Sequence, residues 1–386
     1  MGTDISKFRR DLLRWYAASK RDLPWRRTRD PYAILVSELM LQQTQVKTAL
    51  PYYEKFLRHF PNPEALASAS ENAVLASWAG LGYYRRARFL RAAAQAIVAR
   101  GSFPEHLEGI RALPGVGAYT AAAVGSIAFG LQQAVVDGNV IRVLARLAAL
   151  GADPTCGEGA KKVRDLAQNL LDLKRPGDFN QALMELGATV CVPDKPRCHD
   201  CPVQGHCAGF LEGKPGDYPR LPPRAATQVL VKAVVLALRG SGPRSEILTR
   251  ARSSRQEAKF GASKTRLEGF WAFPEFEVPS LDFSAAEVRA VKEIRRLVGS
   301  EAPLTGRLPR VRHRITVYDI HLLPLRFFVP KSASLAPAAI KQGWQWVGLS
   351  KLADLPLASA EKKLLTLLNR VLVPNEGRGS QLGLIL

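Results

Sequence analysis

One short stretch of the chain contains four of its five cysteines, which are Cys191, Cys198, Cys201 and Cys207. Six, two and five residues separate them in turn. At this spacing four thiolates can converge on one centre without a ligand from elsewhere in the chain. A tetrahedral zinc ion and an iron–sulfur cube both accept four thiolates, so the spacing alone leaves the metal open. Because the cysteines fill every ligand position, we predict a structural metal site.

Lys195 and Arg197 lie between the first two of these cysteines. A loop clamped by a metal would hold both cations outward, which predicts contact with phosphate groups. The alternative is an ordinary solvated surface, where two exposed cations are also common.

Two carboxylates could do acid–base chemistry. Glu38 lies in a predicted helix over 32–50, where it shares a face with apolar residues. Partial burial there would raise the pKa of this carboxyl, and a raised pKa suits a general acid near neutral pH. Asp137 stands at the start of another predicted helix, the one that follows the alanine-rich helix over 118–129. The alternatives are a solvent-facing rim position for Glu38 and a helix N-cap for Asp137 or Asn139.

Gly115 and Gly117 form a predicted tight turn in front of an alanine-rich helix over 118–129. Glycine adopts the positive φ angles that such turns need, and the free N–H groups of the helix start favour an anion. A turn between two helices without a ligand would have the same sequence, so the pattern is weak by itself.

The composition indicates what must position these residues. The 386 residues, 47% of them apolar, are enough for two domains of ordinary size. A net charge of +21 favours an anionic partner, either nucleic acid or an acidic membrane surface. The sequence contains no long apolar run and no signal-peptide pattern, so we expect a soluble protein of a reducing, intracellular compartment.

The pattern changes along the chain. Residues 11–210 are typical of helices separated by glycine and proline, whereas period-two runs and one amphipathic helix over 284–298 follow a proline-rich stretch. We expect strands at 229–238, 246–249, 270–276 and 315–323. The predicted organisation is an all-α domain over 1–212, a linker over 213–228, an α+β domain over 229–373 and a frayed tail over 374–386.

Six motifs occur along the chain in the order that is typical of a known family. They are residues 22–26, 37–44, 80–84, 113–117 and 136–140 and the four cysteines. They resemble the MutY-type adenine DNA glycosylases of the helix-hairpin-helix superfamily over about residues 8–210. In that family a cysteine loop with this spacing, here 191–207, holds a [4Fe–4S] cluster, so the resemblance favours iron–sulfur over zinc.

The resemblance implies catalytic roles residue by residue. Glu38 is similar to the family's general acid, which protonates the adenine ring, and Asp137 to the group that stabilises an oxocarbenium-like sugar. Tyr119 resembles the active-site tyrosine and Asn139 the residue that orients the catalytic groups.

The resemblance also implies binding roles. It places Trp25, Arg26 and Gln181 in an adenine pocket, and Gln43 and Tyr83 among side chains inserted into the base stack, where a base is extruded before chemistry. The glycine turn, Lys195 and Arg197 are then expected to contact the DNA backbone.

The C-terminal half resembles the Nudix-like domain with which this family reads 8-oxoguanine on the opposite strand. Residues 269–274 and 344–347 carry the likeness. Arg296 and Leu297 stand where a Nudix hydrolase has metal-binding carboxylates, so we expect no pyrophosphate hydrolysis. In the recognition loop Thr316 keeps a hydroxyl, but the next residue is a valine that cannot donate a hydrogen bond. His313 or Arg314 could supply that donor from a shifted loop.

The expected function is that of a monofunctional glycosylase, acting as a monomer on double-stranded DNA with adenine opposite 8-oxoguanine or guanine, in a bacterial cytoplasm and without a membrane. An endonuclease-III-like lyase is the alternative enzyme, but its Schiff-base lysine is replaced here by Tyr119. A non-catalytic damage binder is the third hypothesis, which the presence of both Glu38 and Asp137 disfavours.

Overall fold

The computed structural model describes residues 4–223, 226–240, 245–252, 269–315, 317–352 and 355–372. The chain divides into two compact units, one formed by Met1–Ser77 with Arg86–Arg224 and the other by Trp78–Arg85 with Ala225–Leu386. The second division falls inside the predicted linker. The sequence does not predict that Trp78–Arg85 belongs to the second unit. Among the described residues, no helix combines the length and the apolar character needed to cross a bilayer.

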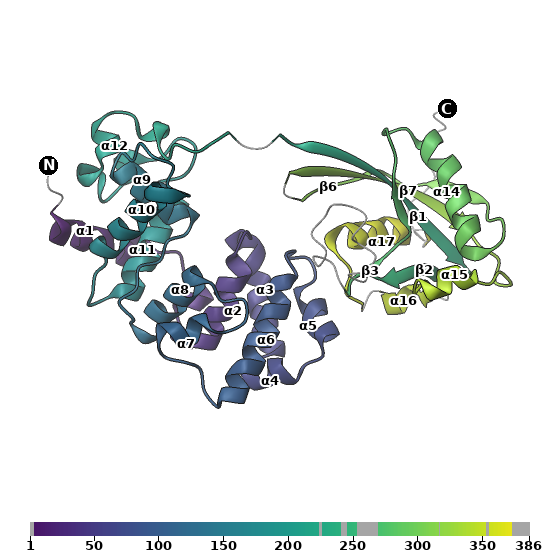
Figure 1. Cartoon of the computed structure of the whole chain (residues 1–386), viewed down its shortest axis with the longest axis horizontal. Coiled ribbons are helices and arrows are strands. Elements are labelled where there is room, and N and C mark those ends of the chain that lie inside the picture. Colours follow the sequence, from purple (N-terminus) through teal and green to yellow (C-terminus); the bar gives the residue numbers. More distant parts are fainter. Residues whose placement is uncertain are drawn as a thin grey trace, which may run out of the picture. The chain divides into compact units, whose positions relative to one another are not determined.

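The N-terminal part of the chain is helical, as predicted (Figure 1). Its longer elements are α1 (Ile5–Ser19), α2 (Pro31–Leu41), α3 (Val46–His59), α4 (Pro63–Ser68), α5 (Glu71–Trp78), α6 (Arg85–Arg100), α7 (Leu107–Arg111), α8 (Ala118–Phe129), α9 (Gly138–Leu147), α10 (Gly157–Leu170), α11 (Pro176–Thr189) and α12 (Ala208–Leu211). Short 3-10 turns are η1 (Pro24–Arg26), η2 (Cys198–Asp200), η3 (Gln204–His206) and η4 (Pro215–Asp217).

The packing of the first unit explains where a carboxylate can be desolvated. One core forms where α1, α9, α10 and α11 pack together, with Phe8, Leu144 and Phe179 fully buried. Helix α2 packs against α8 and is buried along nearly its whole length. Glu38 therefore lies on a helix that has almost no solvent-facing side.

The predicted helix over 32–50 is wrong in its length. Helix α2 ends at Leu41, and a new helix starts at Val46 after a turn in which Gln43 has a φ of 56°. The buried guanidinium of Arg86 donates hydrogen bonds to the carbonyl oxygens of Leu39, Met40 and Gln42. Because a side chain from α6 takes these acceptors, the last turn of α2 needs no continuing helix.

The second unit contains a mixed sheet with helices on both faces. Its elements are β1 (Gln228–Arg239), β2 (Glu246–Ala251), β3 (Trp271–Ala272), β4 (Glu275–Glu277), α14 (Phe283–Val298), β5 (Leu304–Arg307), β6 (Val311–Ile315), β7 (Tyr318–Phe328), α15 (Pro337–Lys341), β8 (Gln345–Gly348), α16 (Leu349–Leu352) and α17 (Ser359–Leu372).

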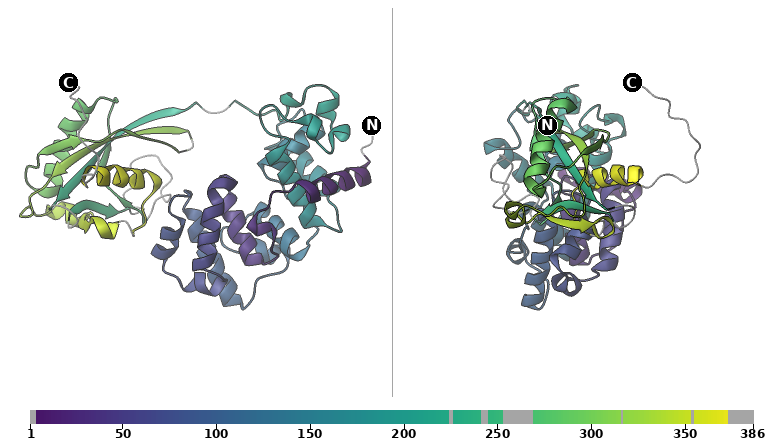
Figure 2. Two further views of the ribbon diagram at one scale, coloured as in Figure 1. Left: turned by 180° about the vertical axis from the view of Figure 1, so that it is seen from behind. Right: turned by 90° about the vertical axis from the view of Figure 1, so that its right-hand side faces the viewer.

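The sheet is organised around β1 and β7, which pair in parallel from Gln228 opposite Tyr318 to Leu238 opposite Phe328. The main strand order is β3-β2-β1-β7-β5, with β4 on β1, β6 on β7 and β8 on β2. Helix α14 packs on one face and α17 on the other, each over its own apolar core (Figure 2, right). The predicted fold class, an all-α domain followed by an α+β domain, is confirmed.

Two predicted strands are wrong in detail. The segment 315–323 is not one strand, because β6 ends at Ile315 and β7 begins at Tyr318 across a hairpin. The segment 270–276 is divided at Phe273 and Pro274 into β3 and β4, which pair with different neighbours. Proline lacks the N–H that a continuous strand would use there.

Candidate active site

Glu38 lies in the interior of the first unit, where it is 5% exposed. The hydroxyl of Tyr119, from the first turn of α8, donates a hydrogen bond of 2.6 Å to Glu38 Oε2. Burial, together with the charge of Asp137, raises the pKa of Glu38 to about 7 against the opposing effects of the Tyr119 hydrogen bond and Arg26. A carboxyl with this pKa holds its proton in a large fraction of molecules near neutral pH.

Asp137 caps α9 and also contributes to the charge around Glu38. Its Oδ1 accepts a hydrogen bond from the Val140 amide at 2.7 Å, and its Oδ2 accepts one from Asn139 Nδ2 at 3.0 Å. Burial raises the pKa of Asp137, and these hydrogen bonds oppose the rise. Asp137 is therefore the N-cap of α9, as the alternative predicts. Its charge also raises the pKa of Glu38.

Arg142 joins Asn139 to the cysteine loop. Its Nη2 donates to Asn139 Oδ1 at 2.9 Å and to the Gly187 carbonyl at 2.8 Å, and its Nε donates to the Cys191 carbonyl at 2.8 Å. A Cβ at Gly187 would lie 2.7 Å from Asn139 Cβ, so α11 approaches α9 closely here. Our sequence reasoning missed Arg142, although its place one helical turn after Asn139 is a usable signal.

A second buried carboxylate holds one residue of the predicted adenine pocket. Glu185 is fully buried on α11, and it accepts hydrogen bonds from Arg26 Nη2 at 2.7 Å and from Arg21 Nη2 at 2.6 Å. Burial favours the neutral form of Glu185, but the hydrogen bonds from both arginines outweigh it and lower its pKa to about 2. Glu185 and Arg21 were not predicted as site residues, although a glutamate inside an apolar helical pattern is an available signal.

The other predicted pocket residues lie nearby in the first unit. Trp25 is 7% exposed and packs edge-on against Tyr53, with ring centroids 5.2 Å apart. Gln181 is half-buried on α11, one helical turn before Glu185. Tyr119 also contacts Met184 of the same helix. Tyr119 thus links Glu38 of α2 to α11, the helix that carries Gln181 and Glu185.

The residues predicted to contact DNA have distinctive backbones. Gln43 and Tyr83 adopt positive φ angles of 56° and 50°, which non-glycine residues rarely do. Gly115 has a φ of 76°, and a Cβ there would collide with Phe89. Gly117 is the N-cap of α8 and offers no side chain to its first-turn N–H groups. These amides match the predicted anion site.

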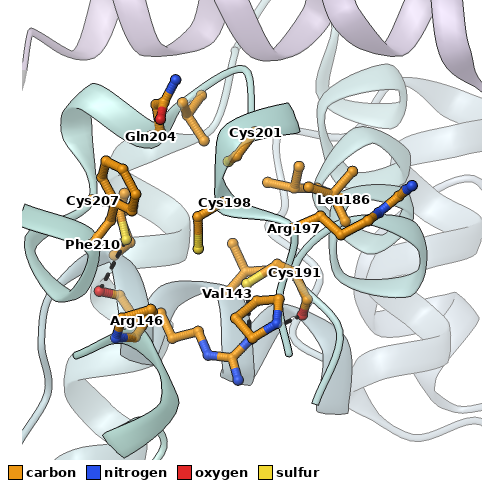
Figure 3. Close-up of a pocket in the computed structure, with 15 residues that line it drawn as sticks. Val143, Arg146, Leu186, Cys191, Arg197, Cys198, Cys201, Gln204, Cys207 and Phe210 are labelled. Carbon is orange, nitrogen blue, oxygen red and sulfur yellow. Dashed lines mark hydrogen bonds between the residues drawn. The ribbon is translucent and has the colours of Figure 1, made fainter. Parts of the chain in front are cut away.

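The four cysteines line one pocket (Figure 3). Burial raises the pKa of Cys201 to about 12 and also raises the pKa of Cys198 and Cys207. Arg146 of α9 donates to Cys191 Sγ at 3.4 Å and to the Val192 carbonyl at 2.7 Å. Thiols gathered in a buried pocket beside a guanidinium suit thiolate ligands of a metal group.

The two predicted phosphate contacts of this loop are exposed. Lys195 has a positive φ of 52°, and Arg197 donates to the Thr189 carbonyl at 2.7 Å. Within the described part of the chain, no three histidine, cysteine or acidic side chains converge closely enough to hold a single metal ion.

The predicted opposite-base residues belong to the second unit. Thr316 lies outside the described residues. His313 is half-buried on β6, opposite Ile320, and burial lowers its pKa while Glu275 raises it. Its ring therefore lies on the α17 face of the sheet. On α14, Arg296 pairs with Glu293 at 2.7 Å and Leu297 is fully buried, so neither position supplies a carboxylate.

The chain resembles known repair proteins. The family of HhH-GPD superfamily base excision DNA repair proteins matches residues 36–175. An adenine DNA glycosylase of Rattus norvegicus is 50% identical over 230 residues, which cover 57% of this chain and 45% of that protein. The chain thus spans about half the length of the curated relatives that it matches.

Solved structures are similar to each half. A thermostable thymine-DNA glycosylase is 32% identical, with a TM-score of 0.50, and the match covers 54% of this chain and 97% of that one. A MutT protein from Methanosarcina mazei Go1 is 14% identical, with a TM-score of 0.29, and covers 38% of this chain and 97% of that one.

Proposed function

Because the chain belongs to the HhH-GPD superfamily of base excision DNA repair proteins, we propose that it is an adenine DNA glycosylase acting on adenine mispaired with 8-oxoguanine or guanine. The observation that carries this proposal is the pair of buried carboxyl groups, Glu38 with a pKa of about 7 and Asp137 beside it. A proton donor next to a second carboxylate suits the cleavage of a glycosidic bond.

The reaction follows from the two different environments. Neutral Glu38 transfers its proton to a ring nitrogen of adenine, so that the electron pair of the C1′–N9 bond leaves with a neutral base. Asp137, as a carboxylate, stabilises the positive charge that develops on the sugar. A water molecule then adds its oxygen to C1′ and releases the proton that restores Glu38. Tyr119 and Asn139 hold the two carboxyl groups in place by the hydrogen bonds described above.

The adenine itself would be held by the neighbouring side chains. Trp25 offers an aromatic surface, Arg26 a guanidinium fixed by Glu185, and Gln181 an amide. Such groups suit an extruded purine, which needs stacking and hydrogen bonds on its edge. Gln43 and Tyr83 would fill the space that the extruded base leaves in the duplex.

We propose that Cys191, Cys198, Cys201 and Cys207 hold a [4Fe–4S] cluster. The thiols surround a pocket, and no three described side chains converge on one ion, which fits a polynuclear group better than a single zinc ion. When bound, the cluster supplies a structural cross-link for the loop 191–207. Lys195, Arg197 and the amides around Gly115 and Gly117 would then contact DNA phosphates.

The second unit would read the base opposite adenine, with the hairpin around Thr316 as the contact and His313 as an alternative donor. We also propose the domain boundaries predicted from the sequence, a monomeric state and a cytoplasmic location. Position 119 is a tyrosine and not a lysine, so this position supplies no amine for a Schiff base, which supports a monofunctional enzyme.

The test is release of free adenine from duplexes that place adenine opposite 8-oxoguanine, guanine or cytosine. We expect release from the first two, loss of release by several orders of magnitude in Glu38→Gln with duplex binding retained, and no change in the control Glu64→Gln, which alters an exposed glutamate. Borohydride trapping should give little covalent product. Efficient trapping, or excision by Glu38→Gln at the wild-type rate, would contradict the proposed chemistry.

A further inference from the structure

The hairpin of β6 and β7 carries a cluster of cations on one face of the sheet. In its register, Arg312 lies opposite His321 and Arg314 lies opposite Asp319, while Val229 of β1 pairs with Asp319 from the other side. The side chains of Arg312 and Arg314 are 56% and 67% exposed. Strand β6 and the start of β1 extend as a ribbon beyond α14, the helix that packs on this face among the described residues (Figure 1).

One carboxylate organises the cluster. Asp319 is 5% exposed, and its Oδ1 accepts a hydrogen bond of 2.8 Å from Arg312 Nε. Arg314 Nη2 lies 3.8 Å and His321 Nε2 lies 3.7 Å from Asp319 Oδ2. The Arg312 hydrogen bond lowers the pKa of Asp319 to about 2, and the nearby cations contribute to this. Asp319 is therefore charged at neutral pH, and the cluster still has a net positive charge.

Most of the donors in the cluster are not used by Asp319. A guanidinium has five N–H donors in a planar fork, and Arg312 directs only Nε and Nη2 toward the carboxylate. Arg314 is beyond hydrogen-bond distance. Arg312 already bonds both oxygens of this buried carboxylate, so Arg314 at 3.8 Å is not needed to satisfy it.

The spacing along β6 matches a linear array of anions. Arg312 and Arg314 stand at alternate positions of β6, and both side chains are exposed. Alternate residues of a strand are about 6.8 Å apart on one side. This is close to the distance between successive phosphates of a DNA strand, and guanidinium groups match phosphate oxygens in geometry.

We propose that Arg312 and Arg314 bind successive phosphates of one DNA strand, and that Asp319 is the positioning residue that aligns them. This inference rests on the proposed function, because it takes duplex DNA as the ligand. The row ends at the hairpin turn between Ile315 and Tyr318. Phosphate contacts along β6 therefore fix how the second unit lies on the duplex, while carrying no base selectivity themselves.

The first experiment measures duplex affinity against salt concentration for wild type, Arg312→Gln, Arg314→Gln and the double variant. Each phosphate contact contributes about 0.9 to the slope of log affinity against log salt. The double variant should therefore have a slope smaller by about 1.8, so that raising the salt fourfold costs it about twelvefold less affinity than wild type. The effect should be equal for duplexes with 8-oxoguanine or cytosine opposite adenine.

A matched control and a second variant separate positioning from charge. Arg295→Gln removes an arginine that is 68% exposed on α14, and it should leave the slope unchanged. Asp319→Asn removes one negative charge from the domain, so a purely electrostatic patch would bind DNA more tightly. A positioning role predicts the opposite sign, a several-fold loss of affinity, which Asp319→Glu should partly rescue.

Several results would overturn the proposal. An unchanged slope in folded double and single variants excludes the phosphate row, and tighter binding by Asp319→Asn excludes the positioning role. A loss confined to the 8-oxoguanine duplex would show base contact instead. Wild-type protein that binds duplex DNA with the expected slopes but releases no adenine would overturn the proposed function and leave the phosphate row standing.

Discussion

The hydrogen bond between Tyr119 and Glu38 makes the pH dependence of catalysis testable. The Tyr119 hydroxyl donates to Glu38 Oε2 at 2.6 Å, which stabilises the charged carboxylate and lowers its pKa against the effect of burial. Replacing Tyr119 by phenylalanine removes the donor and keeps the ring. The charged form of Glu38 then loses its partner, so the pKa should rise above the wild-type value of about 7.

The size of the change follows from the type of bond. A hydrogen bond to a charged group contributes about 1.5–3 kcal/mol, and about 1.4 kcal/mol corresponds to one pH unit, so the pKa should rise by about 1 to 2. With a pKa of about 7, roughly a quarter of wild-type molecules hold the proton at pH 7.5, against about one in a thousand for an ordinary glutamate of pKa 4.5. Wild-type excision should thus fall above pH 7, and the variant should fall only above about pH 8 to 9.

The assay is single-turnover adenine release from pH 5.5 to pH 9.5 in buffers of constant ionic strength. The readout is the midpoint of the alkaline limb, since the plateau rate can change for other reasons. Tyr32→Phe is the matched control, because it removes a buried phenol hydrogen bond from the same helix as Glu38 and should leave the midpoint in place. An unchanged or lower midpoint in Tyr119→Phe, or a wild-type midpoint near 4.5, would refute the assignment of Glu38 as the acid.

Other predictions follow from the same geometry. Asp137→Asn should lose excision by several orders of magnitude with a melting temperature close to wild type, because an amide oxygen still caps α9 but cannot balance a cation; normal activity per folded molecule would contradict this. The purified protein should contain iron and acid-labile sulfide in equal amounts, and Cys198→Ser should lower both on metal analysis; zinc from iron-loaded cells would refute the cluster. Glu185→Gln should destabilise the first unit by about 3–5 kcal/mol in urea unfolding, since it leaves the largely buried guanidinium of Arg26 without its charge partner. The folded-state pKa of Glu185 is lowered to about 2, so its stabilising contribution is present above pH 4.5 and is lost as the pH falls toward 2; the variant should lack this part of the acid transition.

Local patterns in the sequence determine many of the elements. The alanine-rich run predicts α8 over 118–129, and the structure has this helix with the same bounds, ended by Gly130 in the left-handed conformation. The cysteine spacing predicts a common centre, and the four thiols surround one pocket. These features depend on neighbours in the chain, on turn residues and on hydrophobic period, which a sequence displays directly.

The motifs predict which residues are catalytic, and the structure adds the interactions that shift the pKa of Glu38. Position on an amphipathic helix predicts only partial burial of Glu38, and the resemblance names its role. The pKa of about 7 depends on a helix buried on all sides and on Tyr119, 81 positions away in the chain. Desolvation and charge pairing are properties of the assembled core, so no local window contains them.

Tertiary structure alone decided three further points. Helix α2 stops at Leu41 because a guanidinium from α6 takes its last carbonyl oxygens. Glu185 becomes a site residue because α11 brings it to Arg21 and Arg26, about 160 positions away. The segment after Val311 folds as a hairpin because β7 continues into the parallel pairing with β1. In each case the partner that satisfies a polar group or completes a ladder comes from a distant part of the chain, and only the folded molecule specifies that partner.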